Sequence, residues 1–212
     1  MPLTLICILV GAALALAPPS RAFARPLAAL FLALSVVALA VLVAPMAGRL
    51  LGLPPPPAVR ALYPPVEAAW HLLFGLCVVL GLAVPDARGA VVRAVALYVA
   101  GKFLFFDLGK ALHNAEMEAF FAASGLPVWL HYAVMAAEVA GAAGLLLNRW
   151  LRTGPWATAG LSLIMVAAIL THARNHDPLA DSHDAIKQLV YLIGLAALFA
   201  VGGRSRASDR SR

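Results

Sequence analysis

The chain has 212 residues, 63% of them hydrophobic and 12% charged, and its mean hydropathy is +0.89. Water-soluble domains carry about 45–50% apolar and about 25% charged residues, so this composition predicts a membrane protein and excludes an ordinary water-soluble domain. The formal charge is +6, but the arginines lie in short connections rather than on one face, which excludes a nucleic acid as partner and indicates the lipid bilayer instead.

Seven apolar segments are candidates for membrane helices, because a helix needs about 17 to 25 apolar residues to cross a bilayer. Six of them have that length: residues 26–46, 66–84, 90–110, 128–148, 153–172 and 184–201. The seventh, residues 3–17, resembles the apolar part of a signal peptide but lacks preceding basic residues, so we favour a retained helix over a cleaved one. The sequence therefore predicts an all-α protein, a polytopic membrane helical bundle of about seven transmembrane helices.

The arginines predict how these helices are oriented in the membrane. With seven helices, four groups of arginines fall on one side: positions 21 and 25, 88 and 93, 149 and 152, and 204 to 212. Cytoplasmic loops carry an excess of Lys and Arg, so we expect a multi-pass protein of the cell (inner) membrane with a cytoplasmic C-terminus. Arg49 and Arg60, at the proline-rich connection of residues 53–65, are the exceptions.

The sequence lacks the motifs of several classes of redox, cofactor-binding and catalytic sites. Cys7 and Cys77 stand in separate apolar segments without a C-x-x-C pair, so a dithiol mechanism of the vitamin K epoxide reductase kind lacks its reactive pair. Lys187 lies three residues after Asp184, near the start of the last apolar segment and not in its middle, which argues against a retinal Schiff base. The sequence also has no nucleophile motif, phosphate loop, flavin motif or haem attachment motif.

Four phrases in the second half of the chain form a recognisable pattern: ALYVAGKFLFFDLGKALHN, FFAASGLP, EVAGAAGLLLNRWLR and the TH that ends the next apolar segment. In these phrases, and in its last apolar segment, the chain resembles the DoxX-like family of small four-helix membrane proteins over about residues 90–201. The resemblance implies a four-helix bundle in the C-terminal half. It also suggests a membrane subunit of a thiosulfate- or quinone-linked redox complex, while a distant branch of the family resembles receptor-assembly chaperones.

We therefore expect three parts along the chain. Residues 1–85 hold about three N-terminal transmembrane helices, residues 86–203 form the DoxX-like four-helix membrane domain, and residues 204–212 are a basic cytoplasmic tail. The boundary between the first helical pair and the rest is the connection of residues 53–65, where four consecutive prolines cannot continue a helix.

Two ionisable residues lie near mid-membrane depth. Counted from Ala90 at about 1.5 Å per residue, Lys102 is about 18 Å deep, and Glu138, counted from Pro127 on the next, antiparallel helix, is about 16 Å deep. A charge in hydrocarbon costs about 2.5 to 3.5 kcal/mol on insertion scales, and opposite charges at one level can pair. We expect Lys102 and Glu138 to pair, either as a structural clasp or as the polar floor of a ligand pocket.

Further polar residues share the faces of these two helices. Lys110 and His113 lie about 80° and about 20° around the helix from Lys102. Asp107 lies about 140° away and is expected to pair with Lys110 at i+3. His131 precedes Glu138 by seven residues and so occupies the same stripe. The candidate pocket is therefore lined by Lys102, Lys110, His113, His131 and Glu138.

The segment THARNHDPLADSHD, residues 171–184, is the polar connection between the last two apolar segments. Its candidate binding residues are His172, His176, Asp177 and His183. Two histidines at i, i+4 can bind one metal, but the segment has no H-E-x-x-H and the helix can end before the second histidine, so we predict no metal site. A wet loop that caps helix ends and a pocket mouth for protons or an anionic or quinone-like ligand both remain open. We expect this segment to meet residues 114–127 on one face.

The leading hypothesis for function is an accessory membrane subunit that docks a soluble or membrane oxidoreductase, or exposes a quinone-sized pocket near Lys102 and Glu138. The alternative is a membrane chaperone or a scaffold for assembly, without catalysis. A transporter of protons or small molecules is less favoured, because the inner halves of these helices carry few polar groups. The sequence specifies no cofactor, and a quinone is the class that the resemblance leaves open.

Overall fold

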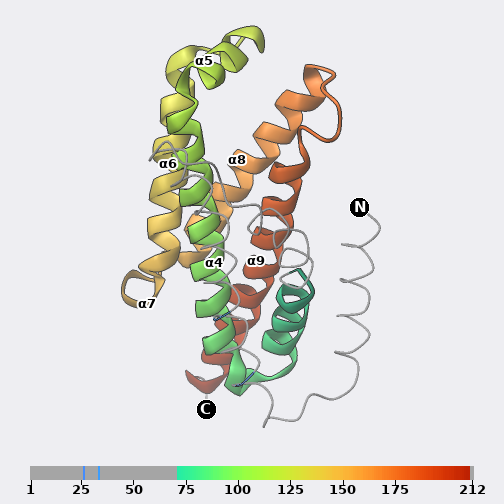
Figure 1. The fold of residues 1–212 in the computed structure, drawn as a ribbon. Coiled ribbons are helices and arrows are strands. Elements are labelled where there is room, and N and C mark those ends of the chain that lie inside the picture. Colours follow the sequence, from blue (N-terminus) through green and yellow to red (C-terminus); the bar gives the residue numbers. More distant parts are fainter. Residues whose placement is uncertain (1–25, 27–32, 34–70, 211–212) are drawn as a thin grey trace. The chain divides into compact units, whose positions relative to one another are not determined.

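The computed structural model of the chain describes residues 71–210, together with Pro26 and Ala33 (Figure 1). All regular secondary structure in these residues is helical, and they contain no strand, which confirms the all-α class. The helices predicted over residues 3–17 and 26–46 and the proline-rich connection lie outside the described residues, apart from Pro26 and Ala33.

Helices follow one another from residue 71 to residue 210 with short connections. They are His71–Ala83, α4 (Pro85–Leu112), α5 (Asn114–Ala123), α6 (Val128–Leu146), α7 (Asn148–Leu151), α8 (Gly154–Arg174) and α9 (His183–Arg210). The last helix continues to Arg210 and so includes most of the segment that the sequence assigned to a basic tail.

Four helices in the described part of the chain are long and apolar enough to cross a membrane. Their apolar spans are Arg88–Leu112, Val128–Leu146, Gly154–Arg174 and His183–Gly202. Each span ends within two residues of the segment that the sequence predicted, which confirms four membrane-length helices in the C-terminal half. Within the described residues the segment predicted over 66–84 is the shorter apolar helix His71–Ala83, and the total of about seven stays a prediction.

The described residues fall into two compact units, and α4 and α9 each contribute to both. One unit is Val99–Ala196, which holds the second half of α4, α5 to α8, and the first half of α9. The other contains, in the described part, residues 71–98 and 197–210. The candidate binding residues all belong to the first of these units.

In the unit of residues 71–98 and 197–210, Arg88 caps the end of the helix His71–Ala83. Its Nε donates to the carbonyl oxygen of Gly81 at 2.8 Å, and its terminal nitrogens reach the carbonyls of Leu82 at 3.3 Å and Val201 at 3.5 Å. The last carbonyls of a helix have no partner inside it, so an arginine at this position supplies the missing donors.

In the unit of residues 99–196, α6 packs against α8 through small residues. A Cβ placed on Gly141 would lie 2.6 Å from Leu161 Cδ2, so only glycine allows this approach. Three residues further along, a Cβ on Gly144 would lie 3.0 Å from that of Ala157. Small residues bring membrane helices close enough for dispersion contacts and polar bonds to hold them together. Here Thr153 Oγ1 donates to the Gly144 carbonyl oxygen at 2.6 Å.

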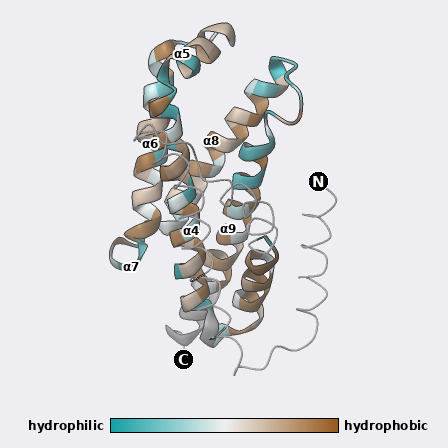
Figure 2. Ribbon diagram, in the orientation of Figure 1, coloured by the Kyte–Doolittle hydropathy of each residue, from teal (hydrophilic) through white to brown (hydrophobic). Residues whose placement is uncertain are grey.

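The outward faces of α6 and α8 are apolar, and exposed tryptophans lie at the starts of these two helices and in α7. Figure 2 shows hydrophobic residues along the middle of α6 and α8 and hydrophilic residues at the end where α5 lies. Trp129 at the start of α6 is 67% exposed, Trp150 in α7 is 70% exposed and Trp156 at the start of α8 is 82% exposed. Tryptophan favours the boundary between hydrocarbon and water, so these faces are suited to contact with a lipid bilayer.

We expect Gly141→Ala to lower the stability of the purified protein in detergent by about 1–3 kcal/mol, because the added methyl group overpacks the α6–α8 contact at Leu161. The matched control is Gly160→Ala on α8, where a Cβ meets nothing within 4 Å. Thermal unfolding followed by circular dichroism measures both. Equal midpoints for Gly141→Ala and the unmodified protein would show that close approach at this glycine does not hold the two helices.

Candidate functional site

Most of the candidate binding side chains in the unit of residues 99–196 lie toward the end where α5 lies, which we call the α5 end. There α4 ends at Leu112, α5 begins at Asn114, and α6 starts at Val128 after the turn through Gly125, whose φ is +67°. The connection between α8 and α9, residues 175–182, lies at the same end, because Asn175 Nδ2 donates to Ser124 Oγ at 2.8 Å. This confirms that residues 171–184 and 114–127 meet.

Three ionisable side chains form an ion cluster, which we define as Asp107, Lys110 and Glu138. The Lys110 ammonium contacts a carboxylate oxygen of Glu138 on α6 and Oδ1 of Asp107 on α4, the latter at 3.3 Å. The side chains of Asp107 and Glu138 are 5% and 1% exposed, while that of Lys110 is 23% exposed. The i+3 pairing of Asp107 with Lys110 is thus confirmed, and two carboxyl groups share one ammonium group inside the protein.

The acceptors in the ion cluster outnumber the donors. Oδ2 of Asp107 is buried and has no hydrogen-bond partner in the part of the chain that the structure describes. Two carboxyl groups offer about eight lone-pair positions, whereas one ammonium group offers three donors, and a proton shared between Asp107 and Glu138, whose side chains lie within hydrogen-bonding reach of each other, would add one more. A buried acceptor without a donor costs about 1–3 kcal/mol. The ion cluster can therefore accept a further donor, such as a hydroxyl group, at Asp107.

The predicted partner of Glu138 was wrong: its ion pair is with Lys110 and not with Lys102. Lys102 is also buried, and its Nζ lies 4.9 Å from the centre of the Phe106 ring, a cation–π distance. The depth estimate failed because it counted each helix from its own membrane edge, whereas contacts between the helices decide which residues stand at the same level.

These contacts give the register directly. His131 on α6 contacts Asn114 at the start of α5, with Nε2 and Oδ1 3.0 Å apart. Glu138 follows His131 by seven residues, and Asp107 precedes Asn114 by seven, so antiparallel helices bring Glu138 to the level of Asp107. Lys102 lies a further five residues away, about 8 Å along the helix axis. The position of Asn114 beside His131 thus explains why Glu138 pairs with Lys110 and not with Lys102.

Next to the ion cluster, four side chains form what we call the amide network: Asn114, Glu118, His131 and Tyr132. Asn114 Nδ2 donates to Glu118 Oε1 at 2.7 Å and lies 2.8 Å from the Tyr132 hydroxyl, which in turn donates to Glu118. His131 is 1% exposed, whereas Tyr132 is 48% exposed. The network therefore runs from a buried imidazole to groups that reach the protein surface.

The amide network changes the acidity of Glu118. The hydrogen bonds from Tyr132 and, next, from Asn114 stabilise the carboxylate and hold the pKa of Glu118 below its usual value. Because the pKa is lowered in the folded protein, the resulting stabilisation is present above the ordinary pKa of glutamate and is lost as the pH falls through the lowered value.

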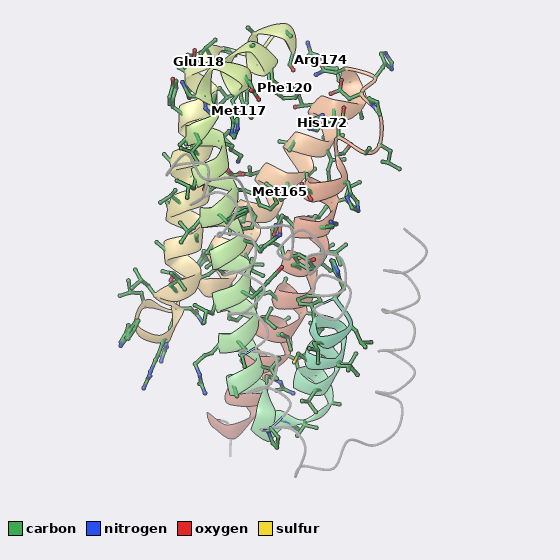
Figure 3. All side chains as sticks on the ribbon, in the orientation of Figure 1. Met117, Glu118, Phe120, Met165, His172 and Arg174 are labelled. Carbon is green, nitrogen blue, oxygen red and sulfur yellow. The ribbon has the colours of Figure 1, made fainter. Side chains whose placement is uncertain are left out.

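A second contact at the α5 end joins α5 to α8. The ring centres of Phe120 and His172 lie 5.1 Å apart, and the sticks of Figure 3 place these two residues on α5 and α8 respectively. His172 Nδ1 lies 2.8 Å from Asp177 Oδ2, an ion pair when the imidazole is protonated. His172 and Asp177, both predicted as binding residues, thus contact each other and help to hold the connection after α8 in place.

The other predicted histidines occupy separate positions. His113 Nδ1 lies 3.0 Å from the carbonyl oxygen of Gly109, between α4 and α5. His176 follows the end of α8 with a left-handed φ of 59°, so it is not one helical turn above His172, and His183 begins α9. Among the described residues, no three His, Cys, Asp or Glu side chains are grouped so as to hold a metal ion.

Three residues of the amide network, Asn114, Glu118 and Tyr132, were not among the binding residues predicted from the sequence. The i+4 spacing of Asn114 and Glu118 on a helix is a signal for a side-chain hydrogen bond that sequence reasoning could have used. Tyr132 offered no comparable signal, because its contact with Glu118 depends on how α5 and α6 are placed in space.

The architecture defines a class: a helical membrane protein whose described residues hold four apolar spans and, toward the α5 end, a buried ion cluster. A family model described as the DoxX-like family matches residues 94–201, just over half of the chain. The chain therefore belongs to the DoxX-like family, as the sequence motifs predicted. No curated protein matches the chain, and neither does any solved structure.

We expect Lys110→Met and Glu138→Gln to be coupled in a double-mutant cycle by about 1–3 kcal/mol, because Lys110→Met leaves the Glu138 carboxylate buried without its cation unless Glu138 is neutralised as well. Unfolding in detergent measures the four free energies. The control cycle replaces Lys110→Met by Lys102→Met, which should be additive with Glu138→Gln within about 0.5 kcal/mol. Stronger coupling in the control cycle would restore Lys102 as the partner of Glu138.

We expect the pKa of Glu118, measured by carbon NMR of a labelled carboxyl group, to lie below the ordinary value of about 4.3. In Tyr132→Phe the pKa should rise toward that value, because the largest cause of the shift is the tyrosine hydroxyl. Trp129→Phe, also on the first turn of α6, is the control and should leave it unchanged. An equal pKa in Tyr132→Phe and in the unmodified protein contradicts the network.

Proposed function

We propose that this DoxX-like protein is an accessory membrane subunit of a redox complex, and that the ion cluster binds the headgroup of a quinone-like molecule. The observation that supports this proposal is the buried Asp107 Oδ2 without a hydrogen-bond partner in the described residues. It stands beside Lys110 within helices long enough to cross the membrane, where an ionisable residue is costly unless it has a partner or a role.

The donor set fits such a headgroup. Lys110 supplies N–H donors for a carbonyl oxygen, and Asp107 Oδ2 supplies an acceptor for a hydroxyl group, so both oxidation states of a quinone find a partner. The bound quinone would supply the redox chemistry. The protein's own residues would orient the headgroup, and Lys102 over the Phe106 ring adds a cationic and aromatic surface on the same helix as Asp107.

The proposal includes a partner and an orientation. An accessory subunit without redox motifs of its own needs a soluble or membrane oxidoreductase to supply electrons. The arginine distribution supports a multi-pass protein of the cell membrane with its C-terminus in the cytoplasm, which would put the α5 end, and with it the quinone site, on the outer side.

A membrane chaperone or assembly scaffold is the second candidate. The observation that favours it is that polar contacts connect the helices. The Lys110–Glu138 pair joins α4 to α6, and the hydrogen bond from Asn175 to Ser124 joins the end of α8 to the end of α5. In that case the ion cluster serves packing alone. A transporter is less favoured, since the described ion cluster and amide network both lie toward the α5 end.

The two candidates predict different contents of the purified protein. We expect mass spectrometry of its lipid extract to show a quinone in stoichiometric amount, and decylubiquinone to bind at least about tenfold more weakly, or about 1.4 kcal/mol, to Asp107→Asn and Lys110→Met. The control is Lys187→Met on α9, whose ammonium pairs with Asp184 at 3.7 Å and should not matter. A co-purifying protein without any quinone would favour the scaffold.

A further inference from the structure

The donor and acceptor roles in the amide network are fixed, because one of its members can only accept hydrogen bonds. An ionised Glu118 carboxylate has no hydrogen to donate, so the group of Asn114 that faces it must be the NH2 group. The same NH2 group lies 2.8 Å from the Tyr132 hydroxyl. Glu118 and Tyr132 therefore hold the Asn114 amide in one of its two possible orientations.

This orientation determines which ring nitrogen of His131 carries hydrogen. The carbonyl oxygen of Asn114 faces His131 Nε2 at 3.0 Å, and an amide oxygen can only accept. Nε2 must then be the donor, and in the neutral imidazole the lone pair stands on Nδ1. The rings of Phe121 and Tyr132, with centres 5.5 Å and 5.0 Å from that of His131, restrict rotation of the imidazole.

We propose that Glu118, acting through Asn114, sets the tautomer of His131 and so presents Nδ1 as a hydrogen-bond acceptor inside the membrane part of the protein. Glu118 and Asn114 are then positioning residues, and His131 is an additional binding residue that recognises a hydroxyl or N–H group. The part of this inference that concerns ligand binding rests on the proposed function. The assignment of the tautomer is independent of the proposed function.

The surroundings of His131 suit this role. The charged groups that face it are Lys110 from α4, Glu118 from α5 and Glu138 from α6. His131 is 1% exposed, so its imidazole lies in the protein interior and not in bulk water. Together with Oδ2 of Asp107, it gives the α5 end a second acceptor, which favours a ligand that brings hydrogen-bond donors over one that brings acceptors alone.

Nitrogen NMR of histidine-labelled protein tests the tautomer, because a ring nitrogen with hydrogen and one without resonate far apart. At a pH where His131 is neutral, we expect hydrogen on Nε2 in the unmodified protein. In Glu118→Gln the neutral amide can donate as well as accept, so the Asn114 amide is no longer held and a mixture of tautomers should appear. Glu116→Gln, on the same helix, is the control and should keep hydrogen on Nε2.

Hydrogen on Nδ1 in the unmodified protein, or unchanged spectra in Glu118→Gln, would overturn the inference. Binding of reduced decylubiquinone is the second measurement, and we expect Glu118→Gln to weaken it several-fold while Glu116→Gln does not. Absence of binding in the unmodified protein, combined with the expected tautomer, would reject the proposed function and leave the positioning role of Glu118 standing. The two failures are therefore distinguishable.

Discussion

The contact on which the unit of residues 99–196 depends is the ion pair between Lys110 and Glu138. Glu138 is 1% exposed in the middle of an apolar helix, so without a cation its charge would stand in a low-dielectric interior at a cost of several kcal/mol. Lys110 supplies that cation from α4 and brings Asp107 with it. Because an interior charge tolerates little displacement from its partner, the pair restricts both sliding and rotation of α4 against α6.

The other contacts in this unit are consistent with the register that the ion pair requires. His131 stands beside Asn114 where the seven-residue spacing from Glu138 puts it, and the small residues Gly141 and Gly144 then let α8 approach the opposite half of α6. Ion pairs and side-chain hydrogen bonds hold the α5 end, while close packing at Gly141 and Gly144, together with the hydrogen bond from Thr153, holds the other half. Membrane helices gain little from hydrophobic association in lipid, so this division of roles is physically expected.

The same restraint bears on the choice between a binding subunit and a scaffold. An ion pair that only clasps two helices needs one carboxylate for its lysine, and this cluster has two. Oδ2 of Asp107 has no hydrogen-bond partner among the described residues. Under the proposed function a bound headgroup would supply the missing donor, and functional sites commonly keep arrangements that stability alone would not favour.

The sequence by itself determined the helical class, the four apolar spans from Arg88 to Gly202 and the family, because composition, apolar length and local motifs are properties of the chain alone. It also determined the contact of Asp107 with Lys110, since a helix puts residues three apart side by side. Only the tertiary structure decided the partners of Glu138 and His131. Those partners depend on the relative shift of two helices, which the placement of α5 and the packing between helices set, and no spacing within one helix encodes that shift.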